Sequence, residues 1–213
     1  MHIPDGVTSI PVIASGYGVA AAATAYSIYR INRKENPRED IPKASLLTAA
    51  FFVASWIHIP IPPTSIHLVL SGLMGAILGY YAFPAILIGL FFQAVMFQHG
   101  GLTTLGINAC IMGLPAIVSH FVFRLRNIGN VESRIKTGIY GFLAGAIAIS
   151  ISIGLFVLVA VNSISGTIDV AGERAAIYAL AIAHLALIPI EGAITAMLAV
   201  FLLRVRPQIL EGV

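Results

Sequence analysis

Long apolar runs separated by very few charges constrain this chain more than any other feature. They lie at about residues 8–29, 44–61, 66–82, 84–98, 107–123, 137–161 and 175–203. Most approach the ~20 residues that a helix needs to cross the hydrocarbon core of a bilayer. Charged residues make up 10% of the chain, against about 25% in a typical soluble domain. The sequence therefore predicts an all-α polytopic integral membrane protein of about seven transmembrane helices, with residues 1–213 forming one domain.

The positive charges predict how the chain is oriented in the membrane. Most of them follow the first, fifth and seventh apolar runs, at Arg30, Arg33, Lys34, Arg38, Lys43, Arg124, Arg126, Arg134, Lys136, Arg204 and Arg206. These positions share one side of the membrane, and only Arg174 falls on the other. The positive-inside rule then places the N-terminus outside and the C-terminus in the cytoplasm. Because the formal charge of +3 is carried by these loops, it indicates topology rather than nucleic-acid binding.

Two connectors between the runs are expected to be irregular. Pro60-Ile-Pro-Pro-Thr-Ser65 cannot continue a helix, because proline lacks an N–H donor, so we expect a stiff connector there and a helix beginning near His67, capped by Thr64 or Ser65. The run His99-Gly-Gly-Leu-Thr-Thr-Leu-Gly106 is too rich in glycine for a stable helix and indicates a cavity or a buried loop. Small residues at helical spacing predict close helix packing, at Gly72, Gly75 and Gly79 and at Gly141, Ala144, Gly145 and Ala148.

The six histidines divide between the two sides of the predicted membrane. His120 and His184 fall inside apolar runs, where a lone histidine is usually a hydrogen-bonded packing residue. The other four, His2, His58, His67 and His99, fall at external ends or connectors. Four imidazoles at one mouth of a protein with so few ionisable groups indicate a metal site or a proton relay.

The position of His2 favours the metal site. A second-position histidine lets the terminal amine, the deprotonated His2 amide and the His2 Nδ1 atom bind one metal through fused chelate rings. One further imidazole would complete a planar set of four nitrogens, which suits Ni(II) and Cu(II) better than Zn(II) or Mg(II). The alternative is a disordered tail, but Pro4 and the turn-forming pair Asp5-Gly6 favour a terminus that folds back to the mouth. Spacing does not choose the fourth donor.

The beginning of the chain bears on this clamp. Its first residues have neither a positively charged lead nor a cleavage site behind an apolar core, so we expect no removed signal peptide. Met1 is expected to stay in place, because its trimming generally needs a small second residue.

Three motifs carry a resemblance to a known family: Met1-His-Ile-Pro-Asp-Gly6, His58-Ile-Pro-Ile-Pro-Pro-Thr-Ser-Ile-His67 and Phe97-Gln-His-Gly-Gly-Leu-Thr-Thr-Leu-Gly-Ile-Asn108. The chain resembles the CbiM/NikM family, the substrate-specific subunits of energy-coupling-factor transporters for cobalt and nickel. The resemblance spans essentially the whole chain. It implies seven helices, an external metal-binding segment at residues 1–7 and metal ligands at Met1, His2 and His67. It thus selects His67 over His58 as the fourth donor.

The segment around His67 bears on which metal is carried. Cobalt-type members usually have a Gly-Ser-Cys/Ser-Ser-His-Pro-Thr-Gly stretch there, whereas this chain has Pro63-Thr-Ser-Ile-His-Leu68 and resembles the nickel branch. We therefore expect Ni(II) as the transported substrate, with Co(II) as the alternative, and no organic cofactor. Supporting residues that orient the ligands are expected among His58, Gln98, His99 and Asn108.

Transport would need an energy source that this sequence lacks. The phosphate-binding motif G-x-x-x-x-G-K-[ST] is absent. The resemblance implies partners that supply the energy: a coupling transmembrane protein, ATPase subunits and a small accessory membrane subunit, in a prokaryotic cytoplasmic membrane. The chain would then be a transporter subunit and not an enzyme.

Three other functions stay open at this point. One is a passive nickel carrier that needs no partners. The others are a proton-gated channel and a membrane metalloenzyme, for which Glu191, the exceptional acidic residue within a predicted span, is the candidate acid or base.

Overall fold

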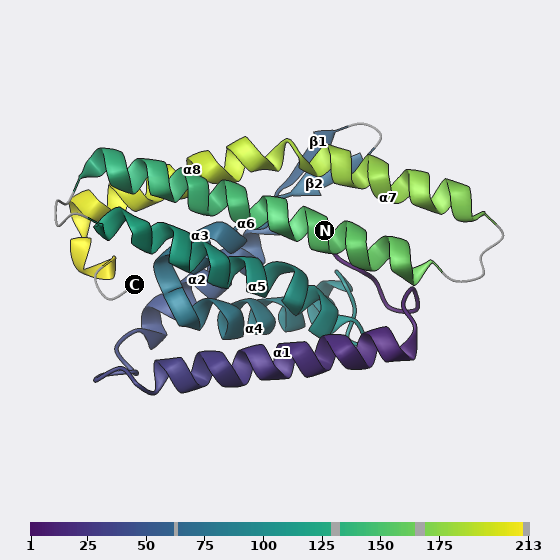
Figure 1. Ribbon diagram of the computed structural model, residues 1–213, viewed down its shortest axis with the longest axis horizontal. Coiled ribbons are helices and arrows are strands. Elements are labelled where there is room, and N and C mark those ends of the chain that lie inside the picture. The colour runs from purple at the N-terminus through teal and green to yellow at the C-terminus, as the bar shows by residue number, and fades with distance from the viewer. Residues whose placement is uncertain (62–63, 129–132, 165–168, 211–213) are drawn as a thin grey trace.

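The computed structural model describes residues 1–61, 64–128, 133–164 and 169–210. These residues form a helical bundle with one short hairpin (Figure 1). The helices are α1 (Ile10–Ile31), α2 (Ile41–Ala54), α3 (Ser71–Leu78), α4 (Ala82–Phe97), α5 (Leu105–Arg124), α6 (Arg134–Ser163), α7 (Val170–His184) and α8 (Leu187–Val205), and the strands are β1 (His58–Ile61) and β2 (Thr64–His67). The predicted all-α membrane architecture is confirmed.

Helix α5 lies at the centre of the bundle. It packs against α1, α3, α4 and α6, while α8 packs along α6 and α2 lies on α4. In Figure 1, α1 forms one side and α6 with α8 the other. Because α5 begins directly after the glycine-rich loop at 99–104, it fixes that loop against the first residues of the chain.

Glycines bring α3, α6 and α8 into close contact, as their spacing predicted. A Cβ atom on Gly72 of α3 would lie 2.5 Å from the Cα atom of Gly145 in α6. A Cβ atom on Gly141 would lie 3.0 Å from the Cα atom of Ala196 in α8. Only residues without a side chain allow such approaches between helix backbones.

Four stretches of the described chain are long and apolar enough to cross a membrane: Ser71–Phe97, Leu105–Asn127, Arg134–Ser163 and Val170–Val205. Helix α2 is apolar but shorter. The expected number of seven spans is therefore not confirmed, although the membrane class of the protein is. Part of the difference arises because the predicted runs 66–82 and 84–98 form one stretch, in which α3 and α4 are joined by a 3-10 turn at Gly79–Tyr81.

The predicted helices on either side of the proline-rich connector are shorter than expected. Instead of reaching residue 61, α2 ends at Ala54, and α3 begins at Ser71 rather than near His67. Between them, β1 and β2 pair antiparallel, with His58 opposite His67. Thr64 and Ser65 thus belong to a strand and cap no helix. Prolines that cannot donate in a helix and β-branched isoleucines both favour an extended chain here.

The last predicted helix is also interrupted. The run 175–203 was expected to be continuous, but α7 ends at His184 and α8 begins at Leu187. Pro189 explains the break, because its ring and missing N–H prevent regular pairing with the turn before it.

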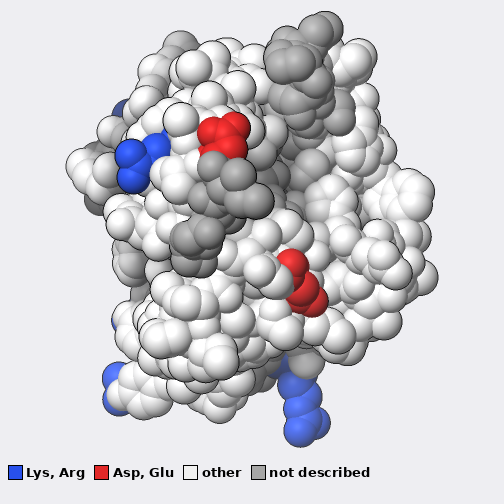
Figure 2. All heavy atoms as spheres, turned by 90° about the vertical axis from the view of Figure 1, so that its right-hand side faces the viewer, with Lys and Arg blue, Asp and Glu red and all other residues white. Residues whose placement is uncertain are grey.

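Positive charge gathers at the end of the bundle where the chain finishes. Arg126 donates to the Leu210 carbonyl at 2.7 Å, and Lys43 donates to the Ile209 carbonyl at 3.4 Å. Arg30 at the end of α1 and Arg124 at the end of α5 line one pocket there. The opposite end of the bundle shows few charged side chains (Figure 2). The cationic residues that predicted the orientation therefore lie mainly at one end of the helical bundle.

Candidate metal centre

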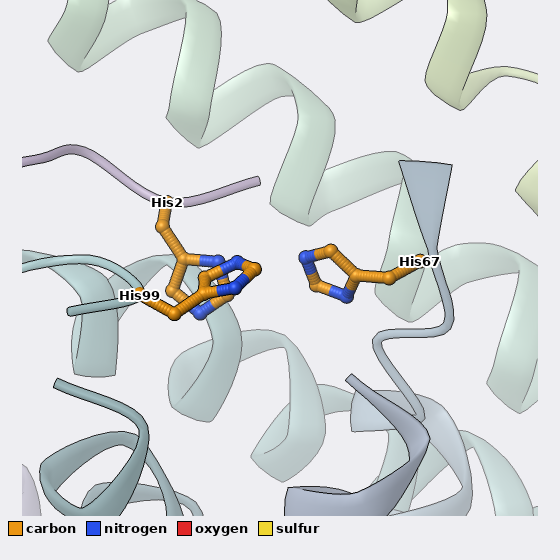
Figure 3. A group of neighbouring side chains, drawn as sticks. All are labelled: His2, His67 and His99. Carbon is orange, nitrogen blue, oxygen red and sulfur yellow. The ribbon is translucent and has the colours of Figure 1, made fainter. Parts of the chain in front are cut away.

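Three histidines from separate segments meet in space (Figure 3). His2 lies in the N-terminal segment, His67 ends β2 and His99 follows α4. Each offers one ring nitrogen, and these nitrogens lie within 4.8 Å of one another. The ring centroids of His2 and His99 are 4.2 Å apart, and those of His67 and His99 are 4.9 Å apart. Among the described residues, this is the single such group of histidine, cysteine or acidic side chains.

The terminal amine of Met1 joins this group. Its nitrogen lies 3.3 Å from Nε2 of His67. The Met1 side chain is buried in the main apolar core, and His67 is also buried. The amine is therefore held inside the protein beside an imidazole.

Hydrogen bonds fix which ring nitrogen of His2 and of His67 is free. Nε2 of His2 lies 3.0 Å from Oε1 of Gln93, and an amide oxygen can only accept, so Nε2 carries the proton. Nδ1 of His2 is buried with no partner among the described residues. For His67, Nδ1 donates to the Leu68 carbonyl at 2.9 Å, which leaves Nε2 as the lone-pair nitrogen. The free atoms are thus His2 Nδ1 and His67 Nε2.

Hydrogen bonds from side chains to the Ile3 backbone dock the N-terminal segment beside α5. The Ile3 N–H donates to Oδ1 of Asn108 at 2.8 Å, and Nδ2 of Asn108 donates back to the Ile3 carbonyl at 3.0 Å. The Thr104 hydroxyl donates to the same carbonyl at 2.7 Å. Ile3 itself is buried. These bonds hold the backbone directly after His2 in one register.

Asp5 ties the same segment to the loop before α5. Its carboxylate accepts from the Leu102 N–H at 3.1 Å and from the Thr103 N–H at 2.9 Å. The loop can pass this close because Gly101 has no side chain: a Cβ atom there would overlap the Asp5 carboxylate. The neighbouring Gly100 has a positive φ of 86°. The turn at Asp5-Gly6, expected from the sequence, thus lies in an N-terminal segment that hydrogen bonds hold against the loop before α5.

Burial keeps the nitrogens of the site uncharged. It lowers the pKa of the Met1 amine from 8.0 to about 5 and the pKa of the His99 ring from 6.5 to about 4. The pKa values of His2 and His67 are lowered as well, first by burial and then by the neighbouring amine. Near neutral pH these groups therefore keep their lone pairs free for a metal.

The structure brings most of the predicted site residues together. Met1, His2, His67, His99 and Asn108 all lie at the centre as described above. His58 lies at its rim: its ring centroid is 6.0 Å from that of His67, and its Nδ1 is 2.9 Å from the Trp56 carbonyl. The antiparallel register that pairs His58 with His67 explains this neighbourhood.

Gln98 does not lie at the site. It is exposed at the C-terminus of α4, where it adopts a left-handed conformation with φ 54°. The glutamine that contacts His2 is Gln93, one and a half turns earlier in α4, which the sequence reasoning missed. A signal existed, because Gln93 is a polar residue inside the apolar run Ile86–Phe97.

The histidines expected to be packing residues lie outside the group. His120 is buried in α5, and His184 is buried at the end of α7, where its Nδ1 lies 2.8 Å from the Leu180 carbonyl. Glu191 is buried in α8 and accepts from the backbone N–H groups of Val69 and Leu70. Its observed hydrogen bonds are thus to the backbone that follows His67.

Comparison with known proteins identifies the family of this chain. The family model CbiM, described as "Cobalt uptake substrate-specific transmembrane region", matches residues 2–209. A Haemophilus influenzae protein named "Putative metal transport protein" is 40% identical over 126 residues, which cover 59% of each chain. An Archaeoglobus fulgidus protein named "Putative fused nickel transport protein NikMN" is 30% identical over 99% of this chain and 68% of its own.

A solved structure shares the fold. The crystal structure of a truncated transition metal transporter is 25% identical, superposes with a TM-score of 0.74 and covers 96% of this chain and 99% of its own. Family, fold and relatives agree that the protein is a membrane component of metal transport and not an enzyme. The chain belongs to the CbiM family of substrate-specific transmembrane components.

Proposed function

We propose that this protein captures Ni(II) at its external face as the substrate-binding subunit of an ATP-driven energy-coupling-factor transporter. The observation that carries the proposal is the pair of fixed tautomers. Hydrogen bonds to Gln93 and to the Leu68 carbonyl leave His2 Nδ1 and His67 Nε2 free, and His67 Nε2 faces the Met1 amine. Supporting hydrogen bonds of this kind commonly orient metal-binding imidazoles.

The proposed coordination set has four nitrogens. The Met1 amine, the deprotonated His2 amide and His2 Nδ1 would form the clamp, and His67 Nε2 would complete the plane. A planar nitrogen set suits Ni(II), whereas Zn(II) prefers tetrahedral sites and Mg(II) prefers oxygen. Cu(II) would bind such a set more tightly still, so its exclusion would rest on metal availability and on the shape of the cavity.

Co(II) is the second candidate substrate. The CbiM family model is described by cobalt uptake, while the Archaeoglobus relative is named for nickel. The planar nitrogen set and the Pro63–Leu68 segment favour nickel. Direct competition between Ni(II) and Co(II) for the purified protein would show which metal it prefers.

Partner subunits would supply the energy for release. The chain has no phosphate-binding G-x-x-x-x-G-K-[ST] motif, so ATP would be hydrolysed elsewhere. The proposed partners are a coupling transmembrane protein, ATPase subunits and a small accessory membrane subunit in a prokaryotic cytoplasmic membrane. Uptake that persists without the ATPase subunits would instead identify a passive carrier.

The first experiment compares the protein that begins at Met1 with a form that carries two extra residues before Met1. Nickel binding is measured by calorimetry, with cobalt as the competitor. Extension moves the terminal amine away from His67 and turns the Met1 nitrogen into an amide, so we expect nickel binding to be lost. Equal binding by both forms would rule out the terminal clamp and leave a site of imidazoles alone.

A further inference from the structure

A second polar pocket lies far from the histidine group, at the end of the bundle where the cations gather. It has a volume of about 480 Å³ and lies between the end of α1, the 3-10 turn at Gly79–Tyr81 and the last turns of α5. Its polar lining comprises four cations and two further side chains: Arg30, Arg33, Lys34, Arg124, Tyr80 and His120. The metal-binding proposal assigns no role to this pocket.

Two buried side chains in the lining have polar atoms without partners. His120 is 3% exposed, and neither of its ring nitrogens has a hydrogen-bond partner among the described residues. Tyr80 is 8% exposed, and its hydroxyl also lacks a partner there. The two rings meet edge to face, with centroids 5.1 Å apart. Buried polar atoms nearly always have a partner, so two such residues in one pocket indicate a missing ligand.

The charges around these rings are predominantly positive. The cations that act on His120 are Arg124, Lys34, Arg30 and Arg126. Lys34 is paired with Asp40 at 2.8 Å. Arg30 donates to the hydroxyl of Tyr26 and stacks on Tyr80, with Cζ 4.5 Å from the ring centroid. In the described part of the chain, Arg30, Arg33 and Arg124 form no ion pair with a carboxylate. The pocket therefore has excess positive charge that an anion would balance.

The surroundings identify the anion as part of a lipid. Phe121, which follows His120 in α5, is 46% exposed, and its ring centroid lies 6.2 Å from that of Tyr80. Leu125, which follows the pocket residue Arg124, is 45% exposed. A soluble anion would gain nothing from these apolar side chains, whereas the acyl chains of a lipid would cover them. Basic pockets between membrane helices on the cytoplasmic side are suited to anionic headgroups.

We propose that this pocket binds the phosphate of an anionic phospholipid in the cytoplasmic leaflet. The arginines hold the phosphate oxygens, which take hydrogen bonds from guanidinium groups well. The Tyr80 hydroxyl and a ring N–H of His120 donate to the same headgroup. The acyl chains run along Phe121 on the outside of α5 and along Leu125, which directly follows that helix.

Native mass spectrometry of the delipidated protein in detergent tests the proposal. Phosphatidylglycerol and phosphatidylcholine with identical acyl chains are added in separate titrations, and soluble glycerol phosphate is added in a third. We expect phosphatidylglycerol to bind more tightly than phosphatidylcholine, with no saturable binding of glycerol phosphate in the same range. If glycerol phosphate binds as tightly as the lipid, the site is one for a soluble phosphate and the lipid assignment is overturned.

Substitutions in the pocket test whether phosphatidylglycerol binds there. Arg124→Gln is expected to weaken phosphatidylglycerol binding by about fivefold, the value of one basic residue near an anionic membrane surface. Tyr80→Phe removes only the hydroxyl and is expected to weaken it by a smaller factor without repacking the site. Arg174→Gln, an exposed arginine on α7, is the matched control and is expected to have no effect.

Nickel binding at the distant metal centre verifies that each variant is folded. It is expected to be unchanged in all three, because none of the substituted residues contacts the histidine group. A preference for phosphatidylglycerol that persists in both Arg124→Gln and Tyr80→Phe would overturn the proposal.

Discussion

The backbone N–H of Leu70 donates to the Glu191 carboxylate at 3.0 Å, across 121 residues of sequence. The same oxygen accepts from the N–H of Val69. Both amides belong to the segment between His67 and α3, where Leu70 has a positive φ of 53°. Glu191 in α8 thus holds the backbone that carries His67, and the acidic residue that the sequence left open as a catalytic group has a positioning role.

Replacing Glu191 by Ala is expected to destabilise the protein. It would leave two buried N–H groups without a partner, and each such group costs roughly 1–3 kcal/mol. Glu191→Gln keeps an acceptor oxygen and should be milder. Thermal unfolding in detergent measures both variants, with Glu173→Gln on the exposed face of α7 as the control. An alanine variant that unfolds like the unaltered protein would show that these hydrogen bonds contribute nothing.

Gln93 in α4 and Gln98 at the C-cap of that helix provide a pair for comparison. Gln93→Leu removes the acceptor that fixes the proton of His2 on Nε2, and loss of such supporting groups lowers metal affinity by about 10–100-fold. Gln98→Leu alters an exposed residue and should leave nickel affinity unchanged. Calorimetric titration of the two variants measures the difference. Equal affinities would mean that Gln93 does not orient His2.

Substitution of single histidines distinguishes ligands from neighbours. His67→Ala is expected to abolish nickel binding, because it removes the imidazole that faces the terminal amine. His58→Ala should cost little, since that ring lies at the rim and is exposed. His99→Ala is expected to weaken binding without abolishing it and to leave the absorption spectrum of planar Ni(II) in place. Loss of that spectrum would make His99 a ligand.

The number of protons released when nickel binds should show whether the Met1 amine is buried. At pH 7 an amine with a pKa of about 5 is already neutral, so nickel displaces about one proton, from the His2 amide. An exposed amine with a pKa of 8.0 would contribute most of a second proton. Calorimetry in buffers of different ionisation enthalpy counts these protons, and a short peptide with the sequence of residues 1–6 is the control. Equal counts for protein and peptide would contradict the burial of the amine.

Docking of the N-terminal segment should also depend on pH. Below pH 8 the undocked amine binds a proton that the docked, buried amine does not, so docking weakens as pH falls from about 8 to about 5. Hydrogen exchange of the Ile3 N–H, which is bonded to Asn108, should follow this change. Asp5 titrates lower, because its hydrogen bonds to Thr103 and neighbouring amides reduce its pKa below 3.8, and its contribution is lost only at more acidic pH.

Sequence reasoning predicted the parts of this protein that depend on composition and on local chemistry. Apolar runs and their flanking charges predicted the helical membrane class and the charge difference between the ends. The chelating geometry of a second-position histidine predicted that His2 belongs to the site. The resemblance supplied His67, which spacing could not choose over His58, and the hairpin register explains why: the two are direct neighbours.

The parts that failed depend on tertiary contacts. Whether a proline-rich segment forms a loop or a hairpin is decided by its pairing partner, so the strands were missed. Gln93 lies on the buried face of α4 beside the N-terminal segment, whereas Gln98 caps the end of the helix and is exposed. A sequence without the fold does not reveal that difference. The break between α7 and α8 was obscured because hydropathy continues through it.

The long sequence separations at the metal centre have a consequence for biosynthesis. The Ile3 N–H forms a hydrogen bond with Asn108, 105 residues later, and the segment after His67 forms one with Glu191 in α8. While the ribosome is still producing the first helices, the opening residues have nothing to dock against, and closing loops of this length is entropically unfavourable until the partners exist. A truncated or half-inserted chain would therefore hold its histidines apart, and only a fully inserted protein would assemble the histidine group.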